Sequence, residues 1–305
     1  MKKTFILVTT VLSLFVANMG FAQDDTQEEC MNNLSIFDSY VKSKKYDDAY
    51  GPWMIVRNKC PKLSRAIYVS GEKILEHKIK NSTGTEQVNF IVDLIALNNQ
   101  YNENFASKFP KVKMLEENAN LKYKYKTELG LTNSDLYIVF DKIYTTEKEN
   151  FKNPKALYTY YSLIVDLFDA GEKSAQQMFD KFDDVNEKIE IEVAKATQKL
   201  NALLAKEEAG TALTKKEGKY KNYYESMLKA YDTISGSMDS KTGIRATCEV
   251  LIPLYQKDFE ENKDNGVWLQ RAMNRMYSKG CKDDPLFLQL VQQKNTIEPN
   301  ADTAF

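Results

Sequence analysis

The longest uninterrupted pattern in the sequence is a run without glycine or proline from Ser174 to about Glu208. Apolar side chains recur along this run at steps of three or four residues, a spacing that places them on one face of an α-helix. The run predicts a single helix about 50 Å long, at 1.5 Å per residue. The apolar positions are Met178, Phe182, Val185, Ile189, Val193, Ala196, Leu200 and Leu203.

The composition of the chain also favours helices. Among 305 residues there are 12 glycines and 7 prolines, about half the usual share, whereas a sandwich or barrel of many strands needs more of these turn-forming residues. Hydrophobic residues make up 43% of the chain and aromatic residues 11%, which is enough for a sizeable core. The 42 Lys and Arg against 43 Asp and Glu leave a net charge of -1, so nucleic acid is not an expected partner.

The N-terminus has the pattern of a secretion signal. Lys2 and Lys3 precede an apolar stretch, residues 5–17, which is followed by the small-x-small sequence Gly-Phe-Ala at residues 20–22. We expect cleavage there, so that the mature chain begins at Gln23. The apolar stretch is shorter than the about 20 residues that span a bilayer, and no later stretch approaches that length. The sequence predicts an exported, periplasmic protein without a transmembrane segment in the mature chain.

Four cysteines lie in two pairs, Cys30 with Cys60 and Cys248 with Cys281, and one predicted helical hairpin separates the members of each pair. In an antiparallel hairpin the start of the first helix lies beside the end of the second, so each pair can reach the Cα separation of roughly 5.5 Å that a disulfide needs. We therefore favour disulfides Cys30–Cys60 and Cys248–Cys281, each worth on the order of 3 kcal/mol. Cys30–Cys281 with Cys60–Cys248, and Cys30–Cys248 with Cys60–Cys281, are the alternatives. A thiolate metal site is disfavoured because the only histidine, His77, is isolated.

Five positions of the first hairpin follow a repeat pattern. Ile36, Tyr40, Ala49, Trp53 and Pro61 have the spacing at which the tetratricopeptide repeat places Leu, Tyr, Ala, an aromatic residue and a terminal proline. The hairpin resembles that repeat, and its wider sequence looks like the opening of exported repeat proteins of bacterial cell envelopes.

Two positions depart from the repeat. Asn33 stands where the motif prefers Trp, and Phe37 where it prefers a small residue. The second cysteine hairpin reproduces the four-three-four apolar spacing of the first, which suggests an internal repeat. The resemblance implies an array of stacked helical hairpins.

The predicted architecture is all-α: an array of antiparallel helical hairpins, a tetratricopeptide-like solenoid, with a long-helix middle region. The stretch 235–240 (Ser-Gly-Ser-Met-Asp-Ser) is the predicted internal boundary. The last eight residues look like the start of another repeat helix, which suggests that the natural chain continues beyond Phe305. The predicted parts are a cleaved signal peptide (1–22), N-terminal tetratricopeptide-like hairpins (23–83), a helical middle region (84–235) and a C-terminal repeat hairpin (241–305).

Signals for catalysis are weak in this sequence. His77 sits among charged neighbours and is typical of an exposed helix histidine, and paired carboxylates such as Asp183-Asp184 fall on helix faces, where solvation explains them. The sequence has neither a glycine-rich phosphate loop nor a nucleophile elbow. We predict a non-enzymatic protein without cofactor or metal. A hydrolase is the less favoured hypothesis.

The predicted function is that of a periplasmic scaffold or adaptor in the cell envelope. Stacked hairpins offer an extended concave surface that suits a protein or peptide partner. Asn33 and Tyr40, on the solvent side of the first hairpin helix, are candidate contacts. Arg271 and Arg275 share one helix face and suit a carboxylate.

Dense tyrosine clusters support an alternative function, a glycan or small-ligand binding module with a tyrosine-lined pocket. Tyrosine gives a binding surface a large area at low entropy cost. Tyrosines packed between adjacent helices, with their hydroxyls at the rim, are the other interpretation of the same pattern. The clusters comprise Tyr123, Tyr125, Tyr158, Tyr160, Tyr161, Tyr220, Tyr223 and Tyr224.

Overall fold

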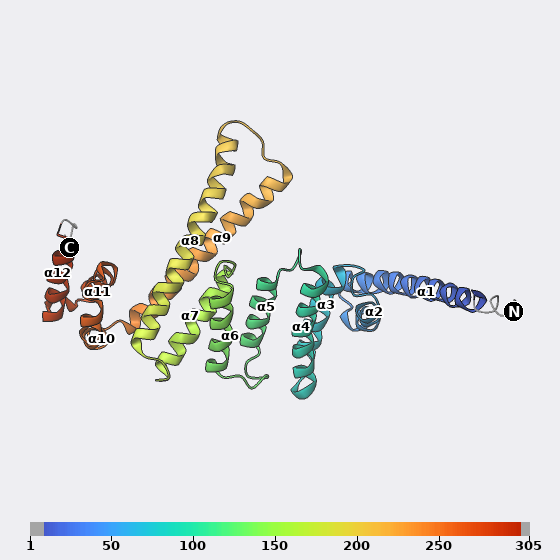
Figure 1. Cartoon of the computed structure of the whole chain (residues 1–305), viewed down its shortest axis with the longest axis horizontal. Helices are drawn as coiled ribbons and strands as arrows, with labels where there is room; N and C mark the ends of the chain where they lie inside the picture. Colours follow the sequence, from blue (N-terminus) through green and yellow to red (C-terminus); the bar gives the residue numbers. More distant parts are fainter. Residues whose placement is uncertain (1–8, 300–305) are drawn as a thin grey trace, which may run out of the picture. The chain divides into compact units, whose positions relative to one another are not determined.

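The computed structural model describes residues 9–299, and their side chains from residue 25 onward. Within that range the chain forms twelve α-helices and one short 3-10 helix, without a β-strand (Figure 1), so the all-α prediction is confirmed. The chain divides into two compact units, unit 1 up to Thr132 and unit 2 from Asn133. As domain limits, residues 84, 235 and 241 stay predictions from the sequence pattern, whereas the helix break expected at residues 235–240 is absent.

Unit 1 consists of helices that pack mainly against their neighbours in the chain. α1 contacts α2, α2 contacts α3, α3 contacts α4 and α4 contacts α5, and α1 also reaches α3. α1 runs without interruption through the predicted cleavage point; residues 1–8 of the predicted signal peptide lie outside the described residues. The helices are α1 (Thr9–Lys42), α2 (Tyr46–Lys59), α3 (Ala66–Asn81), α4 (Gly84–Phe105) and α5 (Lys111–Lys124).

Trp53 of α2 lies at the centre of the unit 1 core. Its side chain is fully buried, and its Nε1 donates a hydrogen bond to the carbonyl oxygen of Ile67, 2.7 Å away. Gly71 of α3 lies directly against the indole ring, where an added Cβ would be 2.6 Å from Cζ2. Arg57, one turn beyond Trp53, lies over the ring at 5.1 Å and forms an ion pair of 2.8 Å with Asp93 of α4. These contacts tie α2 to both α3 and α4.

Unit 2 also packs mainly through helices that are close in the chain. α7 contacts α6, α8 and α9, while α10 contacts α8 and α11, and α11 contacts α12. The helices are α6 (Asn133–Thr146), α7 (Pro154–Asp169), α8 (Ala175–Glu208), α9 (Lys215–Arg245), α10 (Cys248–Asn262), α11 (Gly266–Ser278), the 3-10 helix η1 (Cys281–Asp283) and α12 (Pro285–Ile297).

α7 is the central helix of unit 2, and ten of its 16 residues are buried. The hydroxyl of Tyr160 donates a hydrogen bond to Asp141 of α6, and the hydroxyl of Tyr161 shares one with Thr242 of α9. Burial raises the pKa of both phenols, that of Tyr161 to about 12. The core of unit 2 is therefore built on tyrosines whose polar ends are paired, as buried polar groups require.

Side-chain caps mark the starts of the long helices. Asn153 caps α7, and Ser174 and Thr214 each form a capping box with the residue three positions later, at the starts of α8 and α9. Such caps satisfy backbone N–H groups that have no partner within the helix. The helix predicted over residues 174–208 is present, and its cap is the first residue of the predicted run.

The break that the sequence predicts at residues 235–240 is absent, because α9 continues through it to Arg245. Gly and Ser have low helix propensity, which is why this stretch resembles a linker. In the structure Met238 and Thr242 are buried, and Thr242 is hydrogen-bonded to Tyr161 of α7. Tertiary packing therefore outweighs local propensity here.

The far part of the α8–α9 pair is thinly packed. Every residue between Ala196 and Tyr231 is at least partly exposed, and Figure 1 shows α8 and α9 extending beyond α6 and α7. Lys221 of α9 forms an ion pair of 2.6 Å with Glu207 of α8. This stretch is a helical hairpin that is stabilised by contacts between α8 and α9 and by exposed ion pairs.

Two disulfides are present, Cys30–Cys60 with a Cα separation of 6.3 Å and Cys248–Cys281 with one of 5.6 Å. They are the pairs that the positions of the predicted hairpins favour. Disulfides persist in oxidising compartments, so they are consistent with export. Within the part of the chain that the structure describes, every helix is too short or too polar to cross a bilayer.

Candidate functional site

A groove in unit 1 brings together aromatic and charged side chains from α3, α4, α5 and the loop before α5. Its volume is about 340 Å³. α4 forms its floor, since α3 and α5 both pack on α4. We call it the α3–α5 groove; it is lined by Arg65, Tyr68, Val69, Glu72, Leu94, Asn98, Tyr101, Lys108, Phe109, Lys113, Glu117 and Leu121.

Three aromatic rings form a continuous stack at one end of the groove. The rings of Tyr68 and Tyr101 are parallel with centroids 4.9 Å apart, and those of Tyr101 and Phe109 are nearly parallel at 4.6 Å. The hydroxyl of Tyr101 accepts a hydrogen bond of 3.1 Å from Arg65, and Lys113 lies 5.5 Å from the centre of the Phe109 ring. The stack is therefore flanked by two cations, those of Arg65 and Lys113.

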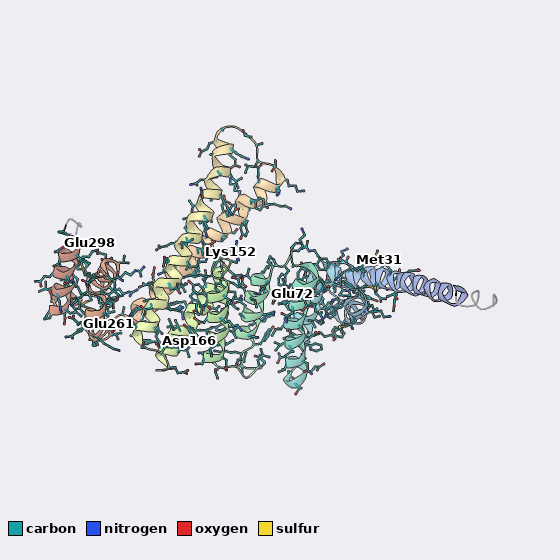
Figure 2. The ribbon with its side chains drawn as sticks, viewed as in Figure 1. Met31, Glu72, Lys152, Asp166, Glu261 and Glu298 are labelled. Atoms are coloured by element: carbon teal, nitrogen blue, oxygen red, sulfur yellow. A yellow bond between two sulfur atoms is a disulfide. The ribbon has the colours of Figure 1, made fainter. Side chains whose placement is uncertain are left out.

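The other end of the groove is acidic. Loss of solvent around Glu72 raises the pKa of its carboxyl, and the negative charges of Glu76 and Glu117 raise it further. Glu72, labelled in Figure 2, lies on α3 seven residues beyond Arg65, which is about 10 Å along a helix. The positive charge of Lys113 on α5 acts in the opposite sense and lowers the pKa of Glu72. The groove therefore has Arg65 beside the aromatic stack, carboxylates at Glu72 and Glu117, and Lys113 close to both.

Asparagines fix the floor of the groove to α5. The amide of Asn98 donates to Asn118 Oδ1 at 2.9 Å, and the amide of Asn118 donates to Asn99 Oδ1 at 2.9 Å. These bonds connect α4 to α5 in a partly buried setting, where a lost partner is costly. They hold the α5 side of the groove in register with its floor.

The predicted contact residues of the first hairpin lie outside this groove. Asn33 is half-buried, and its amide donates to the carbonyl oxygen of Glu29 at 2.9 Å within α1. Tyr40 is half-buried and packs against the unit 1 core. Both side chains therefore make their contacts mainly within unit 1, near the first hairpin.

The two predicted arginines hold a carboxylate of the chain itself. Arg275 of α11 forms an ion pair with Asp183 of α8 and lies 4.8 Å from the centre of the Phe179 ring. Its guanidinium also donates to the hydroxyl of Tyr255 at 3.3 Å. Arg271 is exposed and lies 3.6 Å from Asp183. The pair therefore connects α8 to α11 within unit 2.

The tyrosine clusters divide into core and surface groups. Tyr160 and Tyr161 are fully buried, whereas Tyr220 and Tyr223 are 46% and 52% exposed. The ring of Tyr224 neighbours both of these, with its centroid 6.3 Å from that of Tyr220 and 5.3 Å from that of Tyr223. Tyr123, Tyr125 and Tyr158 are half-buried, so the α9 group is the one that has exposed rings.

The described residues do not form a cluster of metal ligands. Among the residues described, no three His, Cys, Asp or Glu side chains are placed as a metal ion would require, and the four cysteines are all in disulfides. His77 bonds instead to Asp47 at 3.1 Å.

Sequence reasoning missed the α3–α5 groove. Its side chains come from three helices and a loop, and each helix contributes only one or two turns. The signal in the sequence was the local density of aromatic residues and lysines near residues 101–113. This density indicates a binding surface, but it does not tell which other helices complete the groove. No protein-family model matches the sequence, and no curated protein is significantly similar to it.

Proposed function

We propose that the protein is a non-enzymatic scaffold or adaptor that binds a protein or peptide partner of the bacterial cell envelope in the α3–α5 groove. The observation that carries the proposal is the groove itself, in which stacked aromatic rings are flanked by cations and carboxylates. Aromatic anchors surrounded by charged rims are typical of protein-binding surfaces.

The charges of the groove define the chemistry of the partner. An acidic side chain suits the end formed by Arg65, beside the aromatic stack, and a basic side chain suits the end formed by Glu72 and Glu117, where Lys113 offsets part of the negative charge. The ends are about 10 Å apart on α3, a distance that an extended peptide covers in about three residues. Because successive side chains of an extended peptide point to opposite faces, the partner segment carries an acidic and a basic residue two or four positions apart, together with an apolar residue for the aromatic stack.

The proposal extends to the fold and the compartment. Ala49 and Trp53, two of the tetratricopeptide-like positions, are fully buried, and α1 packs on α2 as α3 packs on α4; both facts support a tetratricopeptide-like solenoid of hairpins. The two disulfides and the signal-like residues 1–22 support export to the periplasm. N-terminal sequencing of the protein from cells, with Gln23 as the expected first residue, tests the predicted cleavage.

Site-specific photo-cross-linking in the native bacterium tests the groove. A photoreactive phenylalanine analogue replaces Val69, which is 42% exposed and lines the groove, or Val92, a control on α4 that is 53% exposed and lies outside it. We expect a discrete cross-linked partner at Val69 only. The partner is then purified, and its affinity is measured by calorimetry.

Charge reversal supplies the second arm of the test. Lys108→Glu with Lys113→Glu reverses two positive charges of the groove, and Lys45→Glu with Lys80→Glu makes the same change in net charge at exposed lysines outside the groove. We expect about tenfold weaker binding for the first pair and unchanged binding for the second. Equal cross-linking at Val69 and Val92, or equal affinities of the two double variants, contradicts the proposal.

A further inference from the structure

A second pocket, in unit 2, lies where α8 and α9 meet the segment that precedes α7. Its volume is about 200 Å³. We call it the hairpin-base pocket; Figure 2 labels Lys152, which lines it. The residues used in the argument are Lys152, Glu192, Lys195, Lys199, Tyr223 and Tyr224.

Glu192 places a buried carboxylate in the wall of this pocket. The residue is only 5% exposed, and two ammonium groups, those of Lys188 at 2.8 Å and Lys195 at 3.0 Å, donate to the same oxygen, Oε1. Burial raises the pKa of Glu192, but these hydrogen bonds lower it overall, so the group is a carboxylate. A carboxylate has two acceptor oxygens, so Oε2 offers a second acceptor in the same wall. A carboxylate oxygen in this position suits a ligand that donates from a hydroxyl group.

The rest of the charge in the pocket is mainly positive. Lys152, Lys195 and Lys199 line it, while Lys188, itself 4% exposed, lies beside Glu192 and offsets its charge. Only one further carboxylate, that of Glu149, is part of the lining. Four lysines against two glutamates attract an anion.

Aromatic rings form the α9 side of the pocket. Tyr223 is 52% exposed and meets Tyr224 edge to face, with ring centroids 5.3 Å apart. Lys199 lies 5.9 Å from the centre of the Tyr224 ring. The C–H groups of a sugar ring carry partial positive charge and pack well on the negative face of an aromatic ring.

From these observations we infer that the hairpin-base pocket binds an acidic sugar: one pyranose unit that packs on Tyr223, donates a hydroxyl hydrogen bond to Glu192 Oε2 and places its anionic group among the lysines. The site is independent of the α3–α5 groove. The protein would then have two ligands, a protein partner in the α3–α5 groove and an acidic saccharide in the hairpin-base pocket. This combination suits an envelope protein that contacts acidic polysaccharide.

Calorimetric titration of the mature, disulfide-intact chain tests the inference. The probes are D-glucuronate and glucose 6-phosphate, with D-glucose and inorganic phosphate as the matched halves of the ligand. We expect both acidic sugars to bind about tenfold more tightly than either half. A glucuronate-containing oligosaccharide, compared with the monosaccharide, distinguishes a polysaccharide unit from a free sugar, and binding of either one supports the site.

Paired variants locate the binding to this pocket. Tyr223→Ala removes the exposed ring and Tyr220→Ala removes a ring of similar exposure on the same helix outside the pocket. Lys199→Gln removes a lining charge, with Lys216→Gln, which lies over Tyr220, as its control. These exposed positions are preferred to Glu192, whose loss leaves Lys188 buried without its partner. We expect about tenfold weaker binding for the first member of each pair and no change for the second.

Three results overturn the inference. Absence of saturable binding of both acidic sugars up to about 10 mM removes the site. Inorganic phosphate or glucose binding as tightly as the acidic sugars shows that the pocket recognises only an anion or only a neutral ring. Equal effects of Tyr223→Ala and Tyr220→Ala place the binding elsewhere on α9.

Discussion

The close approach of Gly71 to Trp53 leads to a quantitative prediction about the stability of unit 1. In Gly71→Ala the new Cβ would lie 2.6 Å from Cζ2 and 2.7 Å from Nε1 of Trp53, whereas carbon atoms in good contact are about 3.5–4.0 Å apart. The ring therefore has to move by about 1 Å. It is fully buried, and its movement also weakens the hydrogen bond from Nε1 to Ile67.

The magnitude follows from three contributions. Overpacking of a tight core costs about 1–3 kcal/mol, and the weakened hydrogen bond costs about 1 kcal/mol. Ala in place of Gly in a helix interior returns about 1 kcal/mol. We expect Gly71→Ala to lower the free energy of unfolding of unit 1 by about 1–3 kcal/mol. Gly236→Ala in α9, where nothing lies within 4 Å of the new Cβ, is expected to stabilise unit 2 by about 1 kcal/mol.

Urea unfolding measures both effects because each unit contains one tryptophan, Trp53 in unit 1 and Trp268 in unit 2. A Trp268→Phe background makes Trp53 fluorescence report on unit 1, and a Trp53→Phe background makes Trp268 report on unit 2. Urea unfolding of the Gly71→Ala/Trp53→Phe double variant and of both single variants, followed by circular dichroism, gives the coupling free energy between the two positions. A Gly71→Ala protein that unfolds at the same or a higher urea concentration than its parent refutes the close-packing argument.

Three further outcomes are expected. Cys30→Ala with Cys60→Ala should lower the stability of unit 1 by about 3 kcal/mol, seen in Trp53 fluorescence, while the Trp268 transition stays in place; an equal loss in both units would contradict the local role of this disulfide. Unit 2 should lose stability as the pH rises from about 10, the pKa of an unfolded tyrosine, to about 12, the pKa of Tyr161, because the folded state retains a proton that the unfolded state releases. Tyr161→Phe should make the urea midpoint of unit 2, followed by Trp268 fluorescence, less dependent on pH over this range. Arg275→Met should cost about 1–3 kcal/mol by leaving Asp183 without its main partner and should speed amide hydrogen exchange in α11; Arg271→Met, at the exposed position, should change exchange little.

The helices could be predicted from the sequence where local signals and packing agree. The run from Ser174 to Glu208 combines a capping residue, an apolar period and the absence of breakers, so α8 was predictable nearly to the residue. The stretch 235–240 shows the opposite case. Its Gly and Ser residues indicate a linker, but Thr242 and Met238 are buried, and these contacts are visible only once α7 is in place.

The candidate site was less predictable than the helices, for a geometric reason. Arg65 and Tyr101 are 36 residues apart, and Lys113 follows on a third helix, so helical periodicity gives the face of each residue but not which helices become neighbours. Arg271 and Arg275 illustrate the same limit. Their shared face was readable from a spacing of four, but the carboxylate they hold, that of Asp183, lies 92 residues away from Arg275.

The packing of helices against near neighbours has a consequence for biosynthesis. The main contacts join helices that are adjacent or next but one in the chain, and each disulfide joins cysteines that are consecutive in the sequence. Each segment therefore finds its partners soon after it is made, and low contact order of this kind is associated with fast folding. A chain that emerges N-terminus first from a membrane pore into an oxidising compartment can complete unit 1 and join Cys30 to Cys60 before Cys248 has entered that compartment. Correct pairing then needs no disulfide reshuffling.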